Sequence, residues 1–120
     1  MSEFISKKVK KNVSFKDVAK LDIRVGEILK VEDVEKSKDL MKLTVDFGDF
    51  ERIILASIKN ERENPKEIES KKALFVVNME AKEMFGIKSE GMLFDLGYEN
   101  KITPVLAVPE KDVPNGTCAG

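Results

Sequence analysis

Residues 21–31 read LDIRVGEILKV, and this pattern is the strongest evidence in the chain for a particular fold. Apolar and polar residues alternate from Leu21 to Val25, which is the period of a half-buried strand. After Gly26 the apolar positions shift parity and continue at Ile28. A glycine at a change of parity predicts a bulge or sharp bend in one long strand, a feature that small, strongly coiled barrels need.

The segments on either side predict further strands and two short helices. Ser14 and Asp17 form a capping-box-like helix start, and this helix is expected to run to about residue 20. The segments expected downstream are a strand at 41–47, a hairpin turn at 48–49, a strand at 52–56, a short helix at 65–70 capped by Asn64, a buried strand at 73–78, a strand starting at 92–94, an edge strand at 102–108 and a turn-rich tail at 109–120.

Three meandering strands, a short helix and two more strands are the layout of an all-β OB-fold. We therefore predict a five-stranded Greek-key barrel with short helices and a C-terminal strand extension. A five- or six-stranded sandwich is the alternative that the same pattern allows.

The length and charge of the chain predict one domain with an added arm. The 120 residues suffice for a single core, which we place at 14–120, after a basic arm at 1–13. Residues 1–20 carry six lysines against Glu3 and Asp17, a net charge of +4, whereas the whole chain sums to −1. Such an arm can steer a polyanion towards one part of the molecule, although a solvated leader without a partner would look the same.

Few residues suit catalysis or metal binding. The carboxylates lie beside lysines or on the polar phase of strands, the chain has no histidine, and it has no Cys/His cluster. Gly86 and Gly91 do not form a phosphate-binding motif. We therefore expect a chain that is not an enzyme, with no catalytic residue, metal or cofactor. A weak alternative would pair a serine with a lysine, from among Ser57, Ser89, Lys59 and Lys88.

The single cysteine and the hydropathy bear on location. Cys118 cannot form an internal disulfide and has no His or Asp neighbour to activate it. No apolar run approaches transmembrane length, and the N-terminus lacks a secretory apolar region. A reduced, cytoplasmic location without a membrane is the expectation.

Residues 76–92, VVNMEAKEMFGIKSEGM, form the best candidate site, predicted as a buried strand, a loop and a glycine turn into another strand. In an RNA site an amide would read a base edge, lysines would meet phosphates, a hydroxyl would form a hydrogen bond, and apolar side chains would pack on bases. The candidates for these roles, in that order, are Asn78; Lys82 and Lys88; Ser89; and Met84, Phe85 and Met92. The alternative is that Phe85 and Met92 belong to the core and Ser89 caps a turn.

Four segments, in this order and spacing, resemble a known family: LDIRVG at 21–26, LTVDFG at 43–48, VN at 77–78 and GIKSEGM at 86–92. Together they are similar to the tRNA-binding domain of bacterial methionyl-tRNA synthetases and endothelial monocyte-activating polypeptide. The same domain occurs in freestanding tRNA-binding proteins and in the CsaA-type export chaperone. The resemblance covers roughly residues 14 to 117.

The resemblance implies an OB-fold that binds tRNA by shape without catalysis, alone or with a synthetase such as methionyl-tRNA synthetase. It also implies a homodimer in which the C-terminal part contributes to the interface. Carried over by position, Asn78, Ser89 and Met92 match the family's RNA-contact residues, and Lys82 lies in the turn between them. Lys36, Lys38 and Lys42, with the arm, would add non-specific attraction for RNA.

The chain departs from the family pattern where basic residues are common. Glu80, Ala81 and Glu83 surround Lys82, and residues 78–92 sum to −1. Because counterion release scales with the phosphates neutralised, we expect weak RNA binding with a shallow salt dependence. The rival functions are a CsaA-type chaperone that binds unfolded polypeptide, then a structural subunit that docks on a synthetase, and last a small-molecule enzyme.

Overall fold

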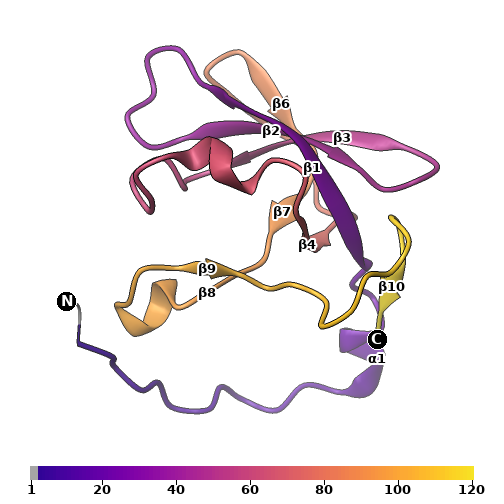
Figure 1. Ribbon diagram of the computed structural model, residues 1–120. Coiled ribbons are helices and arrows are strands. Elements are labelled where there is room, and N and C mark those ends of the chain that lie inside the picture. The colour runs from indigo at the N-terminus through magenta and orange to yellow at the C-terminus, as the bar shows by residue number, and fades with distance from the viewer. Residues whose placement is uncertain (1–2) are drawn as a thin grey trace.

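The structure is a computed structural model that describes residues 3–120 (Figure 1). Its elements, in chain order, are α1 (Phe15–Val18), β1 (Ile23–Asp33), β2 (Met41–Asp46), β3 (Glu51–Ala56), the 3₁₀ helix η1 (Pro65–Ile68), β4 (Lys72–Val76), β5 (Lys82–Met84), β6 (Ile87–Ser89), β7 (Met92–Leu93), β8 (Asp95–Leu96), the 3₁₀ helix η2 (Tyr98–Asn100), β9 (Val105–Leu106) and β10 (Cys118–Ala119).

The main sheet is antiparallel and runs in the order β3-β2-β1-β4-β7. Its two ends approach each other, since the Glu90 amide, just before β7, donates a 2.8 Å hydrogen bond to the Ile53 carbonyl of β3. The sheet is therefore a nearly closed barrel, and the predicted all-β OB-type fold is confirmed. The core inside it consists mainly of Ile28, Val31, Met41, Leu43, Val45, Phe47, Ile54, Ile68 and Phe75, all almost fully buried.

Strand β1 is long because it pairs first with β4 and then with β2 along its length. Residues 23–27 pair with β4 and residues 27–33 pair with β2, and the register with β2 shifts between Ile28 and Lys30. The predicted bulge thus exists, but it lies at Leu29 rather than at Gly26. Gly26 has a different role: a Cβ at this position would lie 2.5 Å from Val45 Cγ1. The glycine lets the strand cross closely over the core.

Both helix caps follow the prediction. The Ser14 hydroxyl accepts a hydrogen bond from the Asp17 amide at 3.2 Å, and α1 ends at Val18. The Asn64 side chain accepts one from the Lys66 amide, also at 3.2 Å. The element that follows is one turn of 3₁₀ helix, not an α-helix, and it ends at Ile68.

Two predictions about strands were wrong in detail, and a third strand is shorter than a regular one. Residues 82–89, predicted as a loop, form the antiparallel hairpin β5–β6. The predicted edge strand at 102–108 contains only β9, which pairs with β8. The strand predicted to start at 92–94 does begin at Met92, and as β7 it has only two residues. In each case short pairing with a neighbour, rather than a long alternating pattern, defines the strand, and such pairing has little sequence signal.

The N-terminal arm runs in extended form along one side of the molecule, below β8 and β9 in Figure 1. Its first two residues, predicted as part of the arm, lie outside the described residues. The Ile5 amide donates a hydrogen bond to the Asn100 backbone carbonyl, and the Ile5 carbonyl accepts one from the Asn100 side-chain amide; both bonds are 2.8 Å long. Within residues 3–120, no helix has the length and apolar character needed to cross a membrane.

Candidate functional site

The hairpin β5–β6 is the most exposed structured part of the predicted site, and it stands at the top of Figure 1. Phe85 and Gly86 form its turn with positive φ angles of 52° and 76°. The base of the hairpin is fixed to β3, because the buried Ser89 hydroxyl accepts a 3.0 Å hydrogen bond from the Leu55 amide. The hairpin is therefore an anchored element rather than a free loop.

Residues 34–40, which connect β1 to β2, lie beside this hairpin. Val34 and Leu40 form a small buried cluster with Leu55, and the hairpin residues Met84 and Ile87 pack against it. The Ser37 hydroxyl holds the connection in shape by accepting a hydrogen bond from the Leu40 amide at 3.0 Å. Two segments far apart in sequence thus form one face.

A shallow cleft of about 350 Å³ opens between these two segments, lined by Glu35, Lys36 and Phe85. Its volume is at the small end of known ligand pockets. Lys36 and Phe85 are exposed, and both have left-handed backbone angles. The structure therefore brings together a lysine from the set predicted for general attraction and an aromatic residue from the predicted loop.

The other predicted lysines lie on or near the same face. Lys82 and Lys88 are exposed on the hairpin, where Lys88 pairs across the strands with Glu83. Lys38 is exposed in the 34–40 connection. Lys42 is half-buried on β2, opposite Glu32. Each lysine on a strand thus faces an acidic partner or lies near one, which lowers the positive potential of the face.

Asn78 lies away from the hairpin tip, where β4 has ended. Its side-chain oxygen accepts a 2.8 Å hydrogen bond from the Asp22 amide, and its nitrogen donates one of 2.7 Å to the Lys20 carbonyl. These two bonds join the segment after β4 to the segment before β1. The predicted base-reading amide is therefore already engaged with backbone in this structure.

Met92 differs from the neighbouring Ser89. Ser89 is buried and bonds to β3 rather than capping a turn, whereas Met92 on β7 is 40% exposed and is not a core residue, so the alternative interpretation of the sequence holds for neither. Met92 lines a pocket of about 420 Å³ with Leu55, Ile58 and Tyr98, together with the carboxyl groups of Glu61 and Asp95. Met92, a predicted RNA-contact residue, therefore lies at a different pocket from the cleft beside Phe85.

Asp39 also lines this pocket, and two of its three carboxyl groups, those of Glu61 and Asp95, are in an electrostatically unfavourable setting. Burial raises the pKa of Glu61, and the nearby charge of Asp95 raises it further. Burial also raises the pKa of Asp95. The structure shows no ion pair to either group within residues 3–120. No group of three or more His, Cys, Asp or Glu side chains within that range could hold a metal ion.

Sequence reasoning missed an arginine pair at the β2–β3 end of the barrel. The guanidinium carbons of Arg24 and Arg52 lie 5.6 and 5.0 Å from the centre of the Phe50 ring, within the range of cation–π attraction. Asp22 accepts hydrogen bonds of 2.8 and 3.0 Å from Arg24, which lower the pKa of Asp22. In the sequence both arginines occupy the polar phase of a strand, so no local pattern marks them.

Comparison with known proteins gives the family. Residues 23–118 match the model described as "Putative tRNA binding domain". The chain belongs to the tRNA-binding domain family. Most of the domain predicted at 14–120, including the barrel and the hairpin β5–β6, falls inside the match.

Curated relatives of this tRNA-binding domain are much longer proteins. The chain is 42% identical over 108 residues to the methionine–tRNA ligase of Archaeoglobus fulgidus. The aligned region covers 90% of this chain but 16% of the ligase. The chain is 39% identical over 105 residues to the ligase of Methanococcus aeolicus, covering 88% of this chain and 15% of that protein.

Solved structures of similar size share the fold of this tRNA-binding domain. A MetRS-related protein from Pyrococcus horikoshii has a TM-score of 0.84 and 33% identity, covering 92% of this chain and 100% of that one. The chaperone CsaA from Bacillus anthracis has a TM-score of 0.78 and 28% identity, also covering 92% of this chain and 100% of that one. The similarity to both kinds of protein matches the resemblance found in the sequence.

Proposed function

We propose that this chain is a non-catalytic domain that binds tRNA by shape, using the face formed by the hairpin β5–β6 and residues 34–40. The observation that carries the proposal is the family match across residues 23–118, which includes both parts of that face. OB barrels bind oligonucleotides through the face of their second and third strands together with two of the loops that flank it. An anchored hairpin beside a lysine-bearing connection fits this use.

The charges of the face support binding that is weak and has a shallow salt dependence. Lys36, Lys38, Lys82 and Lys88 are exposed there. Glu80 and Glu83, which are also exposed, offset part of this charge. Each phosphate contact contributes about 0.7–0.9 to the slope of affinity against salt, so a face with few free lysines gives a shallow slope.

The relatives support association with a synthetase. The chain spans 16% of the Archaeoglobus ligase and 15% of the Methanococcus ligase, so the catalytic activity named for those proteins involves sequence outside this match. We propose that the domain presents tRNA to an aminoacyl-tRNA synthetase, with methionyl-tRNA synthetase as the first candidate, in the cytoplasm. A binding domain of this kind acts by raising the local concentration of tRNA.

The exposed apolar side chains support a homodimer. Several lie on the arm and others on the C-terminal segment beside it: Phe4, Ile5, Val9, Val13, Leu96, Tyr98, Val105 and Val108. Exposed apolar patches of this kind mark protein contacts. In Figure 1 the arm runs beside η2 and β9, on the side of the molecule away from the hairpin, so a partner there would leave the RNA face open.

A titration of bulk tRNA across a salt series tests the function, with an unfolded polypeptide as competitor. We expect measurable binding at low salt that weakens as salt rises and that survives the competitor. Absence of tRNA binding even at the lowest salt would overturn the proposal. Binding of the unfolded polypeptide alone would instead favour the chaperone function, which the likeness to CsaA makes the second candidate.

A further inference from the structure

Phe85 occupies a backbone position that does not suit it. The turn of the hairpin needs positive φ at both central residues, a geometry for which Asn-Gly is preferred and a bulky residue is unfavourable. The chain places Phe85 there, with φ 52°, ahead of Gly86. The ring does not gain burial in return, since Phe85 is 56% exposed. Neither turn geometry nor core packing therefore explains an aromatic residue here.

Lys36, on the facing side of the cleft, has the same kind of strain. Its φ is 70°, and its side chain is exposed. Within residues 3–120, four residues other than glycine have positive φ: Lys36, Ser70, Phe85 and Lys101. Two of these four line one small cleft. Strained backbone positions concentrate at functional sites, where the surrounding structure maintains them.

The surrounding structure holds both residues in place. Met84 and Ile87, on either side of the turn, pack against the cluster that contains Val34 and Leu40. Val34 lies two residues before Lys36, so one apolar cluster supports both walls of the cleft. The Phe85 ring is thus presented on a supported element, which lowers the entropy lost when a ligand binds.

We propose that Phe85 is a stacking platform for one unpaired base of the bound RNA and that Lys36 contacts a phosphate next to that base. This inference rests on the proposed function and adds a specific subsite to it. An exposed aromatic ring beside a lysine is the combination by which proteins hold single-stranded nucleic acid. The cleft of about 350 Å³ is open and shallow, as a flat base needs.

Glu35 also lines the cleft and limits where the phosphate can lie. Its carboxylate repels phosphate, so the phosphate binds on the side of Lys36. The same carboxylate can accept a hydrogen bond from a 2′-hydroxyl or from the amino group of a base. The cleft therefore suits an RNA nucleotide better than an isolated anion.

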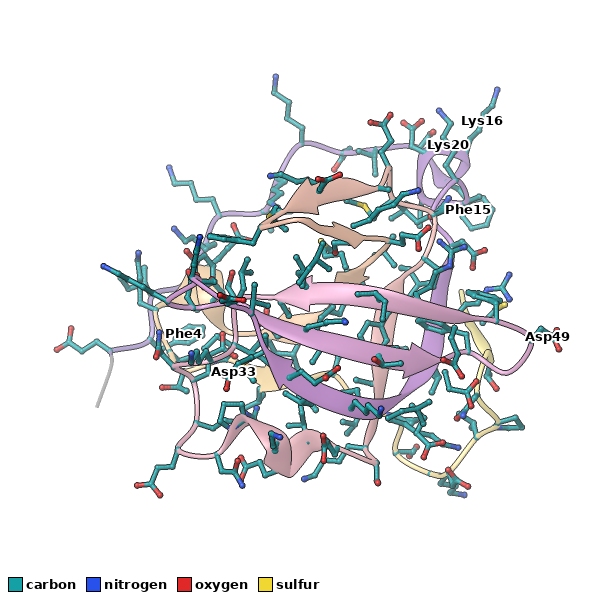
Figure 2. The ribbon with its side chains drawn as sticks, turned by 90° about the horizontal axis from the view of Figure 1, so that it is seen from above. Phe4, Phe15, Lys16, Lys20, Asp33 and Asp49 are labelled. Carbon is teal, nitrogen blue, oxygen red and sulfur yellow. The ribbon has the colours of Figure 1, made fainter. Side chains whose placement is uncertain are left out.

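The experiment uses the absence of tryptophan from this chain. Phe85→Trp introduces a single indole at the proposed platform, and Phe15→Trp introduces one at the exposed ring of α1, distant from the hairpin (Figures 1 and 2). Each variant is titrated with bulk tRNA and with a five-nucleotide single-stranded RNA, and fluorescence emission is followed. We expect both RNAs to quench Phe85→Trp, because a stacked base quenches indole, and to leave Phe15→Trp nearly unchanged.

Substitution by alanine gives the affinity. Phe85→Ala should lower tRNA affinity by roughly five- to a hundredfold, the range found when a stacking aromatic is removed. Phe85→Tyr should retain affinity to within about twofold, since the ring is kept. Phe85→Asn should lower affinity while raising the melting temperature, because asparagine suits the left-handed backbone.

The outcomes separate the subsite from the function. Unquenched Phe85→Trp with normal tRNA binding, or unchanged affinity in Phe85→Ala, would overturn the subsite and leave the proposed function intact. Loss of tRNA binding by the unmodified chain would overturn both. Quenching by an unfolded polypeptide and not by either RNA would also overturn the inference, in favour of a polypeptide site. Circular dichroism of each variant checks that the fold is retained.

Discussion

The side chain of Asn78 illustrates how a residue can match a binding motif and still serve the fold. Its oxygen and nitrogen bond to the backbone of Asp22 and Lys20, more than fifty residues earlier in the chain. Sequence could mark Asn78 as a residue with a directed polar role. It could not identify the partner, because the contact depends on where β1 and β4 lie in the barrel.

Asn78→Ala should therefore destabilise the domain. Removing the amide breaks two exposed hydrogen bonds to backbone groups, and a typical intramolecular hydrogen bond contributes about 0.5–1.5 kcal/mol to stability. Urea denaturation measures the change. A large loss of tRNA affinity in Asn78→Ala with unchanged stability would show that the amide contacts RNA directly instead.

Ser89 and Met92 belong to the same family motif, but we expect substitutions at the two positions to differ in their effect on stability. Ser89→Ala removes the hydroxyl that pairs with the Leu55 amide in a buried setting, so it should cost about 1–3 kcal/mol of stability. Met92→Ala removes a half-exposed side chain and should leave the midpoint of urea denaturation within about 1 kcal/mol. Measuring stability and tRNA affinity for each single variant distinguishes the roles. Equal destabilisation by both would contradict this division.

At the scale of elements, the pocket between the end of β3 and strands β7 and β8 makes the free energy of unfolding depend on pH. Glu61 and Asp95 line it, and burial raises the pKa of both. A carboxyl group whose pKa is raised by folding stabilises the folded state only while it is protonated. That contribution is complete below the ordinary values of 4.5 and 3.8 and is lost as pH rises through the raised folded values.

Glu61→Gln combined with Asp95→Asn should therefore raise the melting temperature at pH 7. The gain should shrink as pH falls and vanish below about pH 3.8, where the original groups are protonated in both states. Thermal unfolding from pH 3 to pH 8 provides the comparison, with Asp49→Asn at the exposed β2–β3 turn as control (Figure 2). A gain that is independent of pH would rule out this explanation.

Sequence predicted some elements better than others, for physical reasons. The strands that alternate over six or more residues, such as β2, were predicted closely, because one buried face enforces the pattern. The hairpin β5–β6 was missed because each strand has three residues and its apolar side chains pack on a remote connection. The candidate lysines could be named from the sequence. That Lys36 and Phe85 line the same cleft could not, because it depends on how the barrel places the two segments.

At the scale of the whole molecule, the arm and the C-terminal segment expose apolar side chains that a second copy could cover. Val9 is 96% exposed and Tyr98 is 76% exposed. We expect the chain to sediment as a dimer at micromolar concentration. Val9→Asp with Tyr98→Ser should shift it to a monomer, whereas Leu29→Ser, at the bulge of β1, should not. A monomeric mass for the unmodified chain would refute the dimer.

In the proposed function, tRNA binds at the face formed by the hairpin β5–β6 and residues 34–40. The most direct test is the salt dependence of tRNA affinity for Lys36→Ala combined with Lys88→Ala. The matched control is Lys71→Ala combined with Lys111→Ala, two lysines that line a different cleft. We expect the first pair of substitutions to weaken tRNA binding and to lower the salt slope by about 1.5, the contribution of two phosphate contacts, while the control pair changes neither. An unchanged slope for the first pair, or an equal loss in the control, would contradict it.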